Sequence, residues 1–233
     1  MVQILNLEDE IIDLLKAIEV SNCRILGEVR SDGELDLAII EGSVTNDEEE
    51  EELKEIRERS RILLALGDCA CHGGKSIVKD YGYDEVEVSL PRGVKNFKSD
   101  PLDKYVKVDY YVYGCPIDRR DFLEAFKSIL IDKKYVPKSY NVCAECILRE
   151  NECLLEKGIL CLGPITRGGC RALCPSFDRE CVGCRGISED ANIESFLEIV
   201  ESKGIKIPND LKMLEKFKAG RDDGKDNRSE EDH

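Results

Sequence analysis

Eight of the twelve cysteines in this 233-residue chain fall between Cys143 and Cys184. They form two groups of four, and each group contains one CxxC pair. We call Cys143, Cys146, Cys153 and Cys161 the first thiol set, and Cys170, Cys174, Cys181 and Cys184 the second thiol set. A CxxC pair lets one turn of backbone aim two thiolates at one metal centre, and two further cysteines complete a tetrahedral shell. The spacing therefore predicts two four-thiolate metal sites.

Three interpretations of these cysteines compete. A disulfide framework is typical of small secreted domains, which a chain of 233 residues without a signal segment does not resemble. Two structural zinc sites would use the same number of thiolates. Two iron–sulfur clusters are the interpretation that we favour, although an all-sulfur shell suits both zinc and iron–sulfur centres. The spacing alone leaves the metal open.

The charge balance limits the classes of partner that this chain can be expected to bind. A net charge of −15 argues against a nucleic-acid surface, which needs clustered basic residues to neutralise phosphates. No apolar run approaches the roughly 18 residues of a membrane span, and the N-terminus lacks the basic and apolar regions of a secretory signal. We therefore expect a cytoplasmic protein with protein partners, and with cysteines that act as ligands and not as bridges.

The apolar pattern of the first half predicts an α/β domain. Residues 6–19 have the period of a core-facing helix, and residues 23–26 are a short β-type run. Leu35–Ile40 is nearly all apolar, as expected for a strand of a parallel sheet covered on both faces. Thr45 to Glu48 has the spacing of a capping box and precedes a charged helix over residues 49–60.

Two strands are predicted to end in cysteine-bearing loops. Arg61–Leu66 is the clearest buried strand, and Cys69 follows it in the loop GDCACHGG. Val106–Tyr113 is the next strand, and Cys115 follows it in the loop GCP. The carboxyl ends of parallel strands share one edge of a sheet, where ligands of open α/β proteins bind. We therefore expect both thiols at that edge.

The remaining segments complete the predicted organisation. Residues 118–130 form a helix whose Phe122, Phe126, Ile129 and Leu130 point inward. Residues 79–105 form a surface excursion, 193–203 a short amphipathic helix and 209–218 another helix. The predicted domains are residues 1–138 for the α/β domain, 139–215 for the cysteine-rich domain and 216–233 for a disordered acidic tail.

Three segments together resemble a known family: GDCACHGG, YGCPIDRRDFLEAF and CLGPITRGGCRALCPSFDRECVGCRG. They are similar to the small subunit of cytosolic nickel–iron hydrogenases, of the sulfhydrogenase delta and methyl-viologen-reducing gamma type. A more distant likeness is to the 20 kDa iron–sulfur subunit of complex I. The resemblance implies a flavodoxin-like parallel sheet domain, here without its first strand, followed by a small cysteine-rich iron–sulfur domain.

The resemblance also implies the sites. Cys69 and Cys115 correspond to two ligands of a proximal 4Fe–4S cluster, which in the family faces the nickel–iron site of the large subunit. The first thiol set corresponds to the distal 4Fe–4S cluster and the second thiol set to the medial one. In this interpretation no catalytic residue lies in the chain, which instead relays electrons within an oxidoreductase complex.

The implied partners are a nickel–iron large subunit and a flavin or ferredoxin-type subunit. An electron-transfer subunit of a complex I relative without hydrogenase activity is the main alternative, and a zinc-binding structural module is a further one.

One feature departs from the family pattern. The family supplies two more proximal ligands from a CxxC just ahead of the first helix, whereas Met1 to Leu5 here already lies at that helix. We therefore expect an incomplete proximal site, from a truncated start or a true variant. Cys71 is a candidate extra ligand, Cys23 is expected to be a small buried apolar residue, and His72 to hydrogen-bond the backbone or a sulfide.

Overall fold

The structure is a computed structural model, and it describes residues 2–5, 16, 18–23, 33–74 and 99–206. Within these residues the chain divides into two compact units, the first ending at Pro137 and the second beginning at Lys138. Most of the predicted helix over 6–19, residues 24–26 of the predicted strand, most of the 79–105 excursion, the predicted helix over 209–218 and the acidic tail lie outside the described residues. A short helix, α1 (Val2–Leu5), is the first element.

The first unit contains a parallel sheet, as predicted. Its strands are β1 (Leu35–Glu41), β2 (Ser60–Leu66) and β3 (Tyr110–Val112), in the spatial order β1-β2-β3. Leu37 lies opposite Ile62 across the first pair, and Leu64 lies opposite Tyr110 across the second. The middle strand is therefore paired on both sides, which explains why its apolar run is the strongest in the sequence.

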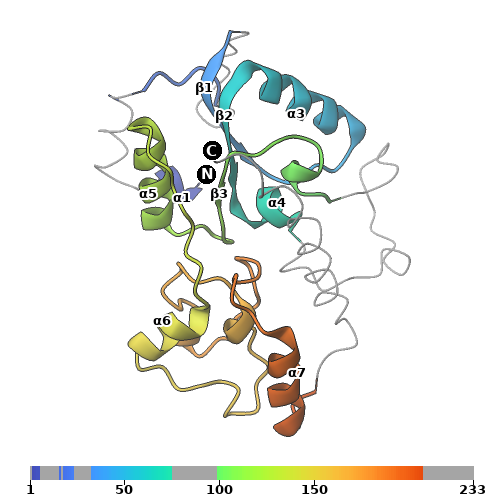
Figure 1. Ribbon diagram of the computed structural model, residues 1–233, viewed down its shortest axis with the longest axis vertical. Helices are drawn as coiled ribbons and strands as arrows, with labels where there is room; N and C mark the ends of the chain where they lie inside the picture. Colours follow the sequence, from blue (N-terminus) through green and yellow to red (C-terminus); the bar gives the residue numbers. More distant parts are fainter. Residues whose placement is uncertain (1, 6–15, 17, 24–32, 75–98, 207–233) are drawn as a thin grey trace, which may run out of the picture. The chain divides into compact units, whose positions relative to one another are not determined.

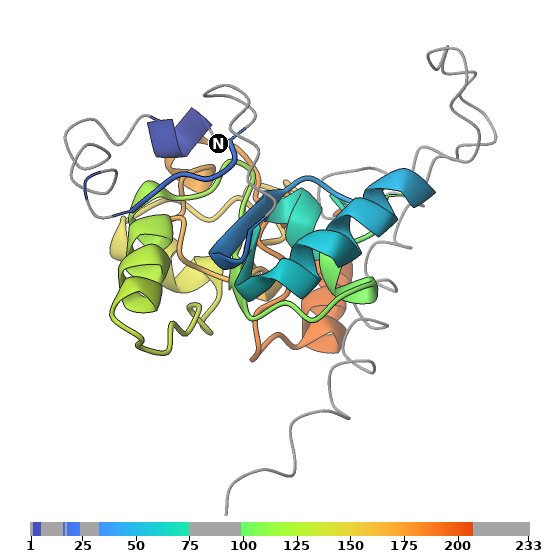
Figure 2. The same cartoon turned by 90° about the horizontal axis from the view of Figure 1, so that it is seen from above.

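Helices cover both faces of this sheet (Figures 1 and 2). Side chains alternate along β2, so Leu64 and Leu66 pack against α5 (Arg119–Leu130) while Leu63 and Ala65 face the other side. On that other side lie α3 (Asp47–Arg59), the short α4 (Gly67–His72) and the 3₁₀ turn η1 (Leu102–Lys104). This arrangement of three layers is that of an α/β fold.

The start of α3 differs slightly from the predicted capping box. The N-cap is Asn46, whose side chain accepts the Glu49 N–H at 2.9 Å, and not Thr45. The Glu49 carboxylate in turn accepts the backbone N–H and the hydroxyl of Thr45, each at 2.8 Å. The reciprocal hydrogen bonds of a capping box are thus present one residue later than predicted. The acid of such a box lies three residues after the N-cap, and Glu49 lies three residues after Asn46.

Five other details depart from the sequence-based expectation. The loop after β2 is a helix, α4, and β3 has three residues instead of the eight expected. Leu130 at the end of α5 is 45% exposed, whereas Phe122, Phe126 and Ile129 are buried as predicted. β1 is mostly half-buried and not fully covered, and among the strands that the structure describes it pairs with β2 alone. Leu102, within the expected surface excursion, is buried in the core.

The second unit has little regular structure among its described residues. Its helices are α6 (Val142–Leu148) and α7 (Ile193–Ser202), with the 3₁₀ turns η2 (Gly163–Ile165) and η3 (Pro175–Phe177) between them. The predicted amphipathic helix is confirmed as α7, which buries Ile193, Phe196 and Val200. These side chains join Val142 and Ile165 in one apolar cluster with Cys161 and Cys181. The thiols of Cys161 and Cys181 are therefore part of the core of this unit.

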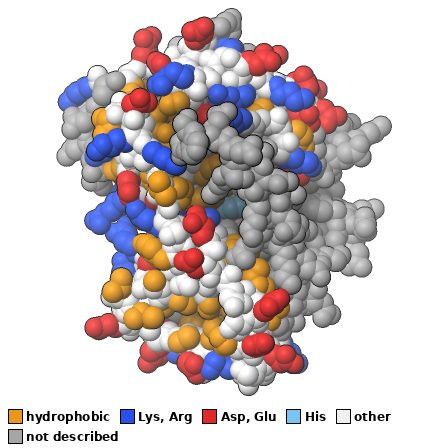
Figure 3. Space-filling model, in the orientation of Figure 1, with side chains coloured by type: hydrophobic (Ala, Val, Ile, Leu, Met, Phe, Trp, Pro, Cys, Tyr) orange, Lys and Arg blue, Asp and Glu red, His pale blue; other side chains and the backbone are white. Residues whose placement is uncertain are grey.

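Acidic and basic side chains are interspersed on the face seen in Figure 3. Among the helices that the structure describes, none combines the length and the apolarity needed to cross a membrane.

Candidate metal centres

Cys69 and Cys115 lie at the carboxyl edge of the sheet. Cys69 is in α4, directly after β2, and Cys115 follows β3. The two segments are tied together, because the N–H of Asp68 donates to the carbonyl of Gly114 at 3.1 Å. Gly67, which precedes Asp68, adopts a φ of +84°, a backbone conformation that favours glycine. Both thiols are exposed.

The electrostatic surroundings of these two thiols are acidic. Partial burial raises the pKa of both thiols, and the negative charge of Asp68 raises it further. Glu41, at the end of β1, acts on both in the same direction, and Cys115 acts on Cys69. A cationic centre is the group that would reverse these effects and hold both sulfurs as thiolates.

Cys71 is turned toward the core of the first unit. Its thiol is 5% exposed and contacts the carbonyl oxygens of Ala65 and Val112 at 3.6 and 3.7 Å. His72 lies with its Nδ1 3.3 Å from Oδ1 of Asp68 and stacks on Tyr113, so within the described residues the polar contact of its ring is with a side-chain carboxylate. Cys23 is only partly buried.

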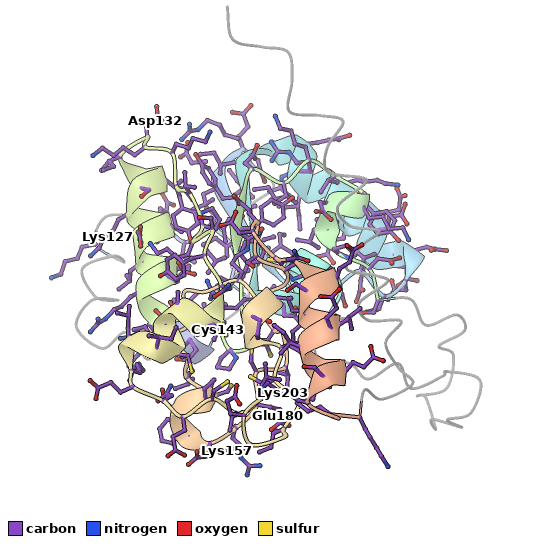
Figure 4. The ribbon with its side chains drawn as sticks, turned by 60° about the horizontal axis from the view of Figure 1, so that its bottom comes forward. Lys127, Asp132, Cys143, Lys157, Glu180 and Lys203 are labelled. Carbon is purple, nitrogen blue, oxygen red and sulfur yellow. The ribbon has the colours of Figure 1, made fainter. Side chains whose placement is uncertain are left out.

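The first thiol set gathers around the start of α6. Asn141 caps this helix by accepting the N–H of Ala144 at 3.2 Å, and Cys143 and Cys146 follow on its first turns (Figure 4). A Cβ at Gly163 would stand 3.3 Å from the sulfur of Cys143 and 3.6 Å from that of Cys161. A glycine at this position therefore leaves room for the two sulfurs.

Electrostatics shows the same grouping. Burial raises the pKa of Cys143 to about 12, and the thiols of Cys161, Cys146 and Cys153 act on it in the same direction. The pKa of Cys161 is likewise raised by burial and by the thiols of Cys146 and Cys153. The N–H groups of Cys181 and Gly163 lower it. Cys143 and Cys161 therefore each lie within electrostatic reach of Cys146 and Cys153.

The second thiol set is built on two turns. Burial raises the pKa of Cys181 to about 12, while the N–H of Gly183 and the hydroxyl of Thr166 oppose this rise, and Cys184 is one of the thiols that act on it. Burial raises the pKa of Cys170, and the N–H of Leu173 lowers it. Cys174 precedes the turn η3.

The two sets adjoin each other. The N–H of Cys181, in the second set, donates to the sulfur of Cys161, in the first set, at 3.3 Å. Both cysteines belong to the same buried apolar cluster.

The donor chemistry fits iron–sulfur clusters. Backbone N–H groups directed at cysteine sulfurs and exclusion of water are the features by which proteins tune such clusters. In the part of the chain that the structure describes, no three His, Cys, Asp or Glu side chains converge on a point where a single ion could sit. A 4Fe–4S cluster does not need such a point, because each of its four thiolates binds a different iron.

Sequence reasoning missed two charged residues beside these thiols. Glu145 stands between the two cysteines of the CxxC pair on α6 and is 7% exposed, and Arg185 directly follows Cys184 and is 1% exposed. Neither residue had a local signal in the sequence, because the hydrogen bonds of Glu145 to Gly169 and of Arg185 to Gly168 join positions far apart in the chain.

Together, the fold and the thiols define a class: α/β chains with cysteine thiols at a sheet edge and in a cysteine-rich second unit. Residues 1–129 match the family model described as NADH ubiquinone oxidoreductase, 20 Kd subunit, and the chain belongs to this family. It is therefore an oxidoreductase-complex subunit, as its resemblance to the wider superfamily predicted.

Curated relatives cover most of the chain. It is 37% identical over 202 residues to sulfhydrogenase 2 subunit delta of Pyrococcus furiosus. This alignment covers 85% of each of the two chains. It is 27% identical over 256 residues to a vhu subunit of the F420-non-reducing hydrogenase of Methanocaldococcus jannaschii, with 93% of this chain and 89% of that one covered. It is 31% identical over 217 residues to an iron-sulfur subunit of the F420-non-reducing hydrogenase of Archaeoglobus profundus, with 68% and 67% covered.

Proposed function

We propose that this chain is the electron-transfer subunit of a heteromeric nickel–iron hydrogenase. It would relay electrons between the active site of a large subunit and a flavin or ferredoxin-type partner. The names of the relatives, which are hydrogenase subunits and include an iron–sulfur subunit, support a role of this kind. The observation that carries the relay is the contact between the two thiol sets through the N–H of Cys181 and the sulfur of Cys161.

In this proposal each thiol set holds one 4Fe–4S cluster, which supplies one-electron chemistry when bound. Oxidation of dihydrogen at the partner releases two protons there and two electrons that leave one at a time. The hydrogen couple at pH 7 lies near roughly −0.4 V, at about 59 mV per pH unit. This value lies inside the range of about −0.7 to +0.45 V open to iron–sulfur clusters.

The residues of the chain contribute three things to the proposed clusters: thiol ligands, exclusion of water from the sulfurs, and hydrogen bonds to the sulfurs. Cys161 and Cys181 are both buried, which keeps water from the sulfurs that they would present to the two clusters. The N–H groups that point at Cys161, Cys170 and Cys181 stabilise negative charge on sulfur. These groups favour the thiolate form that metal binding needs.

At the sheet edge we propose that Cys69 and Cys115 are ligands of a third, proximal site that faces the large subunit. Four thiolates are usual for a 4Fe–4S cluster, so these two supply half of such a shell. The acidic groups Asp68 and Glu41 beside them make thiolates unfavourable without a bound cation. The sheet-edge site would thus belong to the α/β domain over 1–138, and the two other clusters to the domain over 139–215.

Co-purification tests the hydrogenase assignment. The chain is tagged in its native host and isolated without oxygen, and the partners are identified by mass spectrometry and metal analysis. We expect a partner that contains nickel and two CxxC pairs, and bleaching of the visible absorbance of the complex under hydrogen. Cys174→Ser should reduce the bleaching, whereas Cys23→Ser should leave it unchanged.

A nickel-free partner and no response to hydrogen would refute the hydrogenase assignment. The second candidate, an electron-transfer subunit of a complex I relative without hydrogenase activity, would then be supported, and the description of the matching family model favours it as the alternative.

A further inference from the structure

Glu145 connects the two thiol sets. It lies between Cys143 and Cys146 on α6, but its carboxylate reaches the turn that carries Cys170 of the second set. One carboxylate oxygen, Oε1, accepts the N–H of Gly169 at 2.7 Å, and the other, Oε2, accepts the N–H of Ala172 at 3.1 Å. A side chain of the first set's helix thus holds the backbone of the second set's turn.

Two more groups surround this carboxylate. The hydroxyl of Tyr140 donates to Oε1 at 3.2 Å, and the sulfur of Cys170 lies 3.8 Å from Oε2. Burial is nearly complete, with Glu145 7% exposed. Because bulk water screens little at such a site, the negative charge of Glu145 acts strongly on the neighbouring sulfur.

The opposite side of the same turn is held by Arg185. Its Nε donates to the carbonyl of Gly168 at 2.7 Å, and its guanidinium occupies the place where a Cβ on Gly169 would stand. Arg185 is 1% exposed, so a buried cation lies on this side of the turn that carries Cys170, and the buried carboxylate of Glu145 lies on the other. A buried anion and a buried cation therefore act on one sulfur with opposite sign.

The turn needs such support because its backbone is strained. Arg171 and Ala172 adopt φ values of +57° and +49°, in the left-handed region that residues with a side chain rarely occupy. Conformations of this kind persist only where the surroundings hold them in place. The Ala172 N–H bonded to Glu145 belongs to this strained pair.

We propose that Glu145 is a positioning residue that fixes Cys170 relative to the first thiol set and lowers the reduction potential of the cluster held by the second set. The inference rests on the proposed clusters. An added electron is less favourable beside a buried carboxylate, so the negative charge shifts the equilibrium toward the oxidised form.

The test compares the wild type, Glu145→Gln and the control Glu150→Gln, all as full chains prepared without oxygen. Glu150 is exposed and lies on the same segment, so its replacement removes the same charge where solvent screens it. Iron and acid-labile sulfide are counted, potentials are measured by EPR-monitored titration, and hydrogen exchange is measured by mass spectrometry on peptides that contain Gly169 and Ala172.

In Glu145→Gln we expect one of the two cluster potentials to rise by about 59 mV, a tenfold change for a one-electron couple. We expect exchange at the Gly169 and Ala172 amides to be at least about tenfold faster, because an amide has one acceptor where the carboxylate has two. Glu150→Gln should match the wild type. Unchanged potentials and unchanged exchange in Glu145→Gln would overturn the inference.

A failure of the clusters can be told apart from a failure of this inference. A wild-type chain without iron would refute the proposed function, while the exchange rates would still test the contact made by Glu145. If Glu145→Gln does not fold, the cluster potential of Tyr140→Phe tests the inference instead. This variant removes a donor that disperses the charge of Glu145, so the potential should fall, and an unchanged or higher potential would overturn the proposal.

Discussion

Burial and neighbouring thiols act in the same direction on the pKa values of Cys143 and Cys161 in the first thiol set. Burial raises the pKa of Cys143 from the ordinary 9.0 to about 12, and that of Cys181 in the second set by a similar amount. At neutral pH the metal-free chain therefore keeps these protons. Metal binding has to displace them, so cluster assembly releases protons and is favoured by higher pH.

The raised pKa values of these thiols predict how the stability of the metal-free chain changes at alkaline pH. A thiol whose pKa is higher in the folded state stabilises that state below pH 9.0, and the contribution is lost as pH rises toward about 12. We expect the thermal midpoint of the metal-free chain to fall across this interval, and to fall less in Cys143→Ser. Circular dichroism against pH measures both. Lysines titrate in the same interval, so equal slopes for the variant and the wild type would contradict the prediction.

The thiols could be foreseen, but the residues that position them could not. CxxC pairs and their spacing identify the two sets because a ligand pattern is local in sequence. Glu145 contacts Gly169 and Ala172 across more than twenty residues, and no local pattern indicates such a contact. The room that Gly163 leaves beside Cys143 and Cys161 likewise depends on two sulfurs that only the folded chain brings together.

Strands and helices with a strong apolar period were predicted correctly, and the short elements were not. β2, α5 and α7 have such a period, and each appears within a residue or two of its expected bounds. α4 has six residues, too few for a period, and its one local signal is Gly73, whose φ of +70° ends the helix. β3 is short because Val106 and Val108 pack in the core without pairing as strand residues.

The capping of α3 gives a prediction for this element. Asn46→Ala removes the acceptor of the Glu49 N–H, and we expect it to lower the free energy of unfolding by about 1 kcal/mol. Denaturant unfolding of the full chain measures the change. Glu55→Ala is the matched control, because Glu55 is exposed on the same helix and its replacement should change the value by less than about 0.5 kcal/mol. Equal effects of the two variants would contradict the role of Asn46.

For the molecule as a whole, the two units divide the proposed work. The first presents Cys69 and Cys115 at a sheet edge, with Asp68 and Glu41 beside them. The second carries eight thiols, of which Cys161 and Cys181 are buried in its small core. With so little regular structure, bound clusters would add to the stability of the second unit, because metal binding and folding are coupled.

The metal content of the purified chain decides between iron–sulfur clusters and zinc. The full chain is isolated without oxygen and analysed for iron, acid-labile sulfide and zinc, beside Cys146→Ser and Cys174→Ser and the control Cys23→Ser. We predict brown protein with at least about eight irons, four for each set, and a loss of about four in each of the first two variants but not in the control. Colourless wild-type protein with about two zinc atoms, one for each set, would contradict the electron-relay function.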